Sequence, residues 1–107
     1  MDDRREQVRE QVSINACLLL RGEMLKIIAC RIIDISEGGA KIELSVAHPL
    51  PPQVFLVKDE GEIIYECEPA WQNGQVGGLM FRDLCAGAKR KELLDDMLIA
   101  ETMRSPA

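Results

Sequence analysis

Two arginines near the N-terminus have a spacing suited to binding one anion. Arg5 and Arg9 lie four residues apart, with Arg4 beside the first. Guanidinium groups bind phosphate oxygens in pairs and stack flat on aromatic rings. Side chains four apart converge on one ligand from a helical face or around a loop. The alternative is a solvated charged tail, because acidic residues surround both arginines.

A second polar pattern, Asp34-x-Ser36-x-x-Gly39, interrupts an apolar stretch. A carboxylate can accept two hydrogen bonds from the N1–H and N2–H₂ edge of a guanine, and a serine hydroxyl can donate to a phosphate. The glycines Gly38 and Gly39 would let backbone N–H groups approach a ligand closely. The alternative is an ordinary turn, since aspartate, serine and glycine are common turn residues.

The elements that must position these residues follow from the hydropathy pattern. Period-two alternation and turn signals predict six strands, over residues 12–20, 24–35, 40–45, 54–57, 63–71 and 77–81. Pro69 predicts an edge or a bulge in the fifth of them, and apolar spacings of three and four predict a helix over residues 89–103. The chain is therefore expected to be mostly β, a six-stranded antiparallel β-barrel with a C-terminal α-helix.

The predicted organisation is a flexible arginine-bearing arm over residues 1–11, the barrel over residues 12–83, and the helix with its tail over residues 84–107. One ordinary domain accounts for 107 residues. The net charge of −5 argues against a protein that coats nucleic acid. No apolar run approaches the ~18 residues that span a bilayer, and no secretory signal is recognisable. The expected location is cytoplasmic, with no membrane partner.

The four cysteines, Cys17, Cys30, Cys67 and Cys85, form no C-x-x-C pair, and only one histidine accompanies them. A zinc site favours close pairs of such ligands. Buried strand positions are the better interpretation, so no metal site and no cofactor are expected.

The two polar patterns, in this order and at this distance, resemble the PilZ domain, a family of bacterial receptor domains for the second messenger cyclic di-GMP. The segments Glu68-Pro69-Ala70-Trp71 and Gly78-Leu79-Met80-Phe81 resemble the family's late tryptophan-ended strand and the Gly-x-x-Phe strand that follows it. The resemblance covers residues 4–82 and implies a six-stranded barrel with an associated helix, in agreement with the strand count.

The resemblance also implies a site. Arg5 and Arg9 match the arginines that bind the ligand's phosphates and guanines. Asp34 and Ser36 match positions that contact a guanine and a neighbouring phosphate, and Gly39 matches the glycine that permits the turn. Two neighbours are expected as possible additional contacts, Arg4 and Gly38.

Two glycines and two aromatic residues of the late strands remain to be assigned. Gly77 and Gly78 stand together, so either is a candidate for the motif glycine of the late strand. In a chain with only 4% aromatic residues, Trp71 and Phe81 are expected to anchor the core rather than to form ligand platforms.

The expected function is a cyclic di-GMP-binding receptor or adaptor that orders its arm on ligand binding and signals through an unidentified effector protein. No general base stands beside a nucleophile, so no enzyme is expected. The alternative is a PilZ-like protein–protein interaction module that does not bind nucleotide. Ligand stoichiometry and oligomeric state stay open, as does whether the helix packs over an open end of the barrel or against another subunit.

Overall fold

The computed structural model describes residues 10–104 and contains six strands, one short 3₁₀ turn and one α-helix. The predicted arm falls largely outside the described residues, and with it Arg4, Arg5 and Arg9. The elements, in chain order, are β1 (Glu10–Arg21), β2 (Leu25–Ile35), β3 (Gly39–Leu44), β4 (Val54–Lys58), η1 (Asp59–Gly61), β5 (Ile63–Asn73), β6 (Val76–Cys85) and α1 (Gly87–Arg104).

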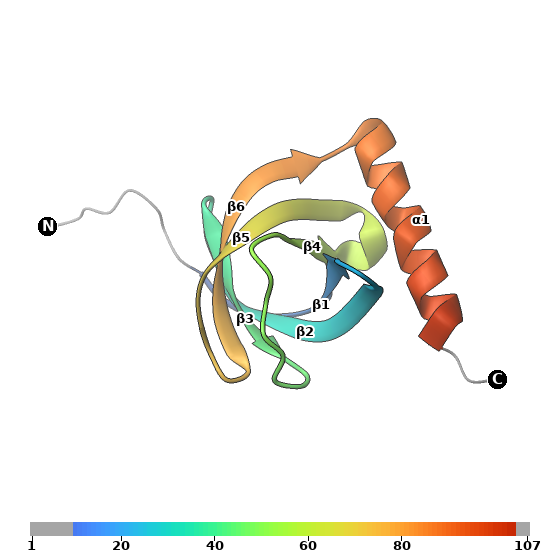
Figure 1. Ribbon diagram of the computed structural model, residues 1–107. Helices are drawn as coiled ribbons and strands as arrows, with labels where there is room; N and C mark the ends of the chain where they lie inside the picture. Colours follow the sequence, from blue (N-terminus) through green and yellow to red (C-terminus); the bar gives the residue numbers. More distant parts are fainter. Residues whose placement is uncertain (1–9, 105–107) are drawn as a thin grey trace, which may run out of the picture.

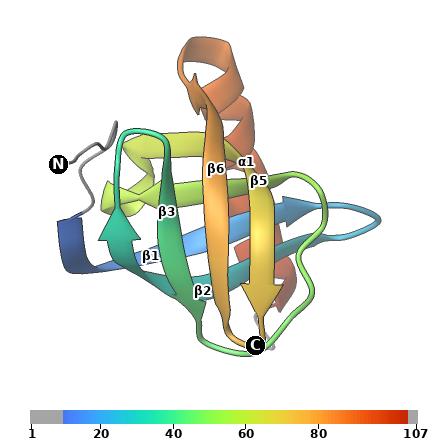
Figure 2. The same ribbon diagram turned by 90° about the vertical axis from the view of Figure 1, so that its left-hand side faces the viewer.

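The strands close into an antiparallel barrel in the order β1-β2-β3-β6-β5-β4, with β4 pairing back to β1. The predicted mostly β fold, with six strands and one C-terminal helix, is confirmed. Strands β3, β6 and β5 form one wall, and β1, β2 and β4 cross behind them to form the other (Figure 2). We call these the front wall and the back wall.

Register irregularities interrupt the pairing of β1 with β2, of β2 with β3 and of β5 with β6. In β5, Pro69 pairs with Leu79 while Trp71 pairs with Gly78, which leaves Ala70 as an extra residue. This is the bulge that Pro69 predicted, because proline cannot donate to a strand ladder.

Two apolar cores are separated mainly by the back wall, and the outer one also includes Ile64 on β5 and Cys85 on β6. One fills the barrel and contains Leu18, Ile32, Ile42 and Leu56, all with exposed fractions of 0%. The other lies outside the barrel, beneath α1. It comprises the following buried residues: Leu19, Phe55, Val57, Ile64, Cys85 and Leu93.

Helix α1 runs along the side of the barrel (Figure 1). It buries Leu93 and Ala100 completely or nearly so, with 0% and 4% of their surface exposed. The sequence left two positions for this helix open; the structure packs it against its own barrel, on the outer surface of a wall rather than over an open end. The physical reason is that Leu19, Phe55 and Val57 point outward from β1 and β4 and need a cover.

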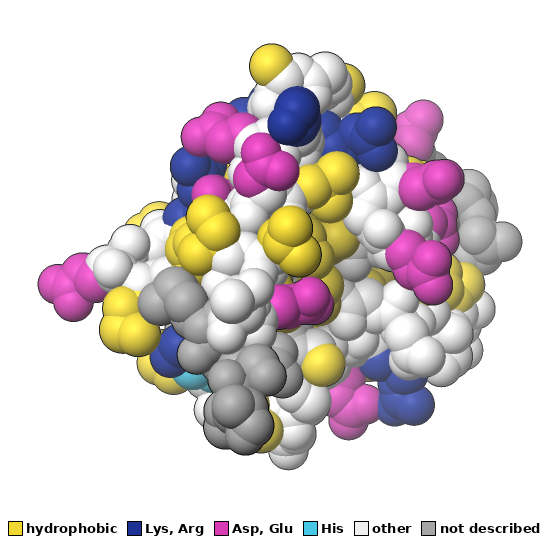
Figure 3. Space-filling view, turned by 90° about the vertical axis from the view of Figure 1, so that its right-hand side faces the viewer, with side chains coloured by type: hydrophobic (Ala, Val, Ile, Leu, Met, Phe, Trp, Pro, Cys, Tyr) yellow, Lys and Arg dark blue, Asp and Glu magenta, His cyan; other side chains and the backbone are white. Residues whose placement is uncertain are grey.

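The outer face of α1 mixes charged and apolar side chains (Figure 3). Leu98 and Ile99 are 65% and 49% exposed. Within residues 10–104, no helix has the length and hydropathy that crossing a membrane requires.

Candidate functional site

The loop between β2 and β3 is a tight turn tied to the front wall. The Ser36 N–H donates to the Gly39 carbonyl over 2.9 Å, and the Phe81 N–H donates to the Gly38 carbonyl over 2.9 Å. Ser36 is buried, with its Oγ 3.4 Å from the same Gly39 carbonyl. The turn is therefore held by backbone contacts and presents a fixed edge at the end of β2.

Gly39 is required for a reason that differs from the expected one. Its φ lies outside the left-handed region, so the turn does not need glycine's backbone freedom there. A Cβ at this position would instead lie 2.2 Å from the Leu79 carbonyl oxygen. Glycine at position 39 thus allows β3 and β6 to approach each other closely.

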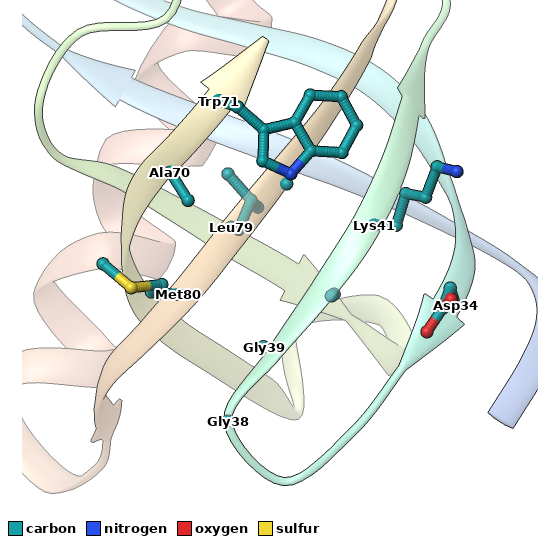
Figure 4. Close-up of a pocket in the computed structure, with 10 residues that line it drawn as sticks. Asp34, Gly38, Gly39, Lys41, Ala70, Trp71, Leu79 and Met80 are labelled. Carbon is teal, nitrogen blue, oxygen red and sulfur yellow. The ribbon is translucent and has the colours of Figure 1, made fainter. Parts of the chain in front are cut away.

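A pocket of about 480 Å³ lies on the outer face of the front wall. Figure 4 shows Asp34 and Lys41 on one side of it and Trp71 and Met80 on the other, with the glycine-rich start of β3 between them. The lining residues are Asp34, Gly38, Gly39, Ala40, Lys41, Ala70, Trp71, Gly78, Leu79 and Met80.

Trp71 forms one side of this pocket, and the prediction that it anchors the core is wrong. Its side chain is 46% exposed. The indole lies over Gly78, where a Cβ would be 2.2 Å from the indole Nε1. The bulge at Ala70 changes the register of β5 just before Trp71, and Gly78 leaves the ring room on the wall. Of the two adjacent glycines, Gly78 is the one that accommodates the tryptophan.

The prediction of a core anchor is confirmed for Phe81. Its ring stacks on Tyr65 with centroids 4.1 Å apart, and it packs against the barrel core. Phe81 is therefore structural, whereas Trp71 lies at the pocket.

The predicted barrel residues gather at one place. Asp34, Gly38 and Gly39 line the pocket, and buried Ser36 holds the adjoining turn. The described chain also starts here, because Glu10 pairs with Ile35 and Gln11 pairs with Asp34. The Arg5-x-x-x-Arg9 segment thus immediately precedes a residue fixed at this end of β2.

Sequence reasoning missed Trp71, Lys41, Gly78 and Met80 as pocket residues. Signals for two of them were present in the sequence. Trp71 is the only tryptophan, and a glycine in the following strand at Gly78 marks a place where a large ring can lie flat. Lys41 and Met80 offered no such signal, because alternation only places them on the outer face.

The four cysteines lie in strands, three of them buried and Cys17 partly so, which confirms the expected interpretation. Burial raises the pKa of Cys30 and of Cys67 to about 12, so both stay protonated at neutral pH. Among residues 10–104 no three histidine, cysteine, aspartate or glutamate side chains gather as metal ligands would.

Comparison with known proteins agrees with this geometry. The model of the PilZ domain family matches residues 3–99, which is nearly the whole chain. No curated protein matches the sequence significantly. The family match includes both polar patterns, the six strands and most of the helix. The chain belongs to the PilZ domain family, whose members are in general receptor domains for cyclic di-GMP.

Proposed function

We propose that this protein is a cyclic di-GMP receptor whose ligand binds in the front-wall pocket. The observation that carries the proposal is the convergence of Asp34, the Gly38-Gly39 backbone and Trp71 on one pocket. That pocket lies where the described chain begins, directly after the two motif arginines.

Each pocket residue has a chemical part in this proposal. The Asp34 carboxylate accepts hydrogen bonds from the Watson–Crick edge of a guanine. The half-exposed indole of Trp71 offers a flat face for stacking on a base, which contributes roughly 1–3 kcal/mol for base–aromatic pairs. Buried Ser36 holds the turn and is proposed to contact the neighbouring phosphate. Arg5 and Arg9 are proposed to bind the phosphates and stack on the guanines.

The proposed signal is an ordering of residues 1–9 against the barrel. A ligand that contacts both the arginines and the front wall joins the two parts, and the joined surface differs from that of the free protein. An effector protein that recognises this surface would complete the pathway, in the cytoplasm of a bacterium. The binding chemistry includes no covalent step, so the protein acts as a receptor and not as an enzyme.

Calorimetric titration of cyclic di-GMP tests the proposal. The wild-type protein is expected to bind with a Kd below about 10 μM, and Arg9→Ala and Asp34→Ala are each expected to weaken binding ten- to a hundredfold, about 1.5–3 kcal/mol. Arg31→Ala and Asp95→Asn are the matched controls, because both side chains are exposed, ion-paired and absent from the pocket lining. Absence of binding heat with the wild-type protein would refute the proposal.

A second candidate function is a protein–protein interaction module that acts without nucleotide. The exposed apolar residues Leu98 and Ile99 on α1 favour it, because they provide a binding surface that does not depend on the pocket. The two functions differ in the same titration: the module would give no heat with cyclic di-GMP, and Asp34→Ala would leave its partner binding unchanged.

A further inference from the structure

Lys41 is a basic side chain in the pocket that neither polar pattern includes. It lies on β3, directly opposite Asp34 on β2 and Gly78 on β6. Its side chain is half-buried and lines the pocket. In Figure 4, Lys41 and Asp34 lie on the side of the pocket opposite the Trp71 indole.

The charged groups of Lys41 and Arg82, the two basic residues of the front wall, have different surroundings. Arg82 Nη1 lies 3.9 Å from Glu68 Oε1 and is thereby partly neutralised. Lys41 forms no ion pair with any carboxylate in the part of the chain that the structure describes. A half-buried ammonium that forms no ion pair within residues 10–104 can attract a bound anion, even with the Asp34 carboxylate on the neighbouring strand.

The chemistry of lysine selects the part of the ligand that it would contact. An ammonium group has three donors and no acceptor, and it acts on phosphate oxygens as a compact charge. The guanine edge presents N–H donors, which pair with Asp34, because an ionised carboxylate only accepts hydrogen bonds. Because the protein has a net charge of −5 and repels a dianion overall, each cation at the pocket contributes to ligand affinity.

We infer that Lys41 is a further phosphate-binding residue of this pocket, supplying positive charge from the side of the pocket opposite Trp71. The inference rests on the proposed function and extends it, because it makes ligand affinity depend on a cation that lies within the rigid barrel. Lys41 on β3 would then bind the phosphate in addition to the two motif arginines.

Titration of cyclic di-GMP into Lys41→Gln tests the inference, with calorimetry and Trp71 emission as two readouts. The substitution is expected to raise the Kd about five- to twentyfold, since the contact is charged but partly exposed. It is also expected to make affinity less sensitive to salt, because one screened charge is gone. Lys41→Arg, which keeps the charge, should stay within about threefold of wild type.

Arg82→Gln is the matched control on the same wall, and its Kd should stay within about twofold of wild type. The melting temperature of unliganded Lys41→Gln should stay within about 2 °C of wild type, which separates ligand binding from a structural role. Equal Kd and equal salt dependence for wild type and Lys41→Gln would overturn the inference while leaving the proposed function intact. No binding by the wild-type protein would overturn both.

Discussion

The two walls of the barrel share one apolar core on their inner faces, but they carry different side chains on their outer faces. The back wall carries large apolar side chains on its outer face, and α1 covers them until Leu19 and Phe55 are 0% and 1% exposed. The outer face of the front wall carries glycines, a half-exposed tryptophan and charged residues, and it is hollowed into the pocket. The outer face of the back wall is buried under α1, whereas the outer face of the front wall is open at the pocket proposed to bind the ligand.

The comparison indicates that the outward-facing residues of each strand determine whether its wall is covered or open to solvent. In β4, four consecutive apolar residues from Val54 to Val57 are buried because both faces are covered. In β3, buried Ala40, Ile42 and Leu44 alternate with the half-buried Lys41 and Glu43. A strand that is apolar on both faces predicts a cover, and an alternating strand predicts an open face.

The largest expected effect is loss of the aromatic residue that fills the back-wall core. Phe55→Ala should destabilise the protein by about 3–5 kcal/mol, because it opens a cavity under α1. Trp71→Ala, on the front wall, should cost less than about 1 kcal/mol of stability, since its indole is half-exposed, yet should weaken ligand binding at least tenfold. Urea denaturation and calorimetric titration measure the two effects.

If Phe55→Ala does not fold, a milder substitution at the same position still allows the comparison. Phe55→Leu should cost about 1 kcal/mol and bind the ligand like wild type. A larger stability loss for Trp71→Ala than for Phe55→Ala would contradict the assignment of roles to the two walls.

Two glycines of the front wall should differ in the same way. Gly39→Ala places a Cβ against the Leu79 carbonyl, which is backbone, so the strands must separate at a cost of about 1–3 kcal/mol. Gly78→Ala places a Cβ against the Trp71 indole, which can swing outward, so it should cost less than about 1 kcal/mol. Gly78→Ala should instead shift Trp71 emission to longer wavelength. Equal destabilisation by both variants would show that the indole is rigidly fixed.

Whether water is excluded from the barrel interior can be tested by measuring stability at alkaline pH. The pKa of Cys30 and of Cys67 is raised by burial to about 12 in the folded state, so these thiols keep their protons after unfolded thiols ionise near pH 9. The unfolded state then binds fewer protons than the folded state, and stability falls as pH rises between about 9 and 12.

Each of these thiols should account for about 1.4 kcal/mol of lost stability at pH 10 relative to pH 7. Urea denaturation of Cys30→Ala and Cys67→Ala at both pH values should show a smaller alkaline loss than wild type. An identical alkaline loss in all three proteins would mean that water reaches the interior thiols.

The last comparison concerns the ion pairs between α1 and the back wall. Arg21 lies 2.9 Å from both Glu92 Oε2 and Asp96 Oδ2. The Asp96 oxygen is buried and has this charge contact rather than a well-aligned hydrogen bond. Arg21→Ala should therefore cost about 1–2 kcal/mol, measured by urea denaturation with ligand affinity unchanged.

Arg31→Ala is the control for that prediction. Its ion pair with Glu43 is exposed, at 49% and 42%, and should be worth less than about 0.5 kcal/mol. If both variants lost the same stability, the attachment of α1 would not depend on the Arg21 pairs.

Much of the fold could be predicted from local patterns. Alternation located all six strands, and Pro69 marked the bulge in β5. The position of α1 could not be predicted, because a helix with one apolar face fits its own barrel or another subunit equally well. The ends of elements also moved: β6 runs to Cys85 rather than residue 81, since pairing with β5 continues as far as Ile64.

The candidate site was predicted in part. Asp34, Gly38 and Gly39 line the pocket, and Ser36 holds the adjoining turn, because all four belong to one short stretch of sequence with a recognisable pattern. Lys41 could not be placed there, and Trp71 was expected in the core despite its signal, since the proximity of both depends on the pairing of β6 with β3 and β5. Residues brought together by strand order leave little signal in a single sequence.

The most direct test of the central claim is a titration of cyclic di-GMP followed by intrinsic fluorescence, because Trp71 is the only tryptophan and lies in the pocket. Saturable quenching is predicted, with a Kd equal to the calorimetric one and below about 10 μM. Asp34→Ala should weaken it at least tenfold. Unchanged Trp71 emission up to about 100 μM ligand would contradict a front-wall site for cyclic di-GMP.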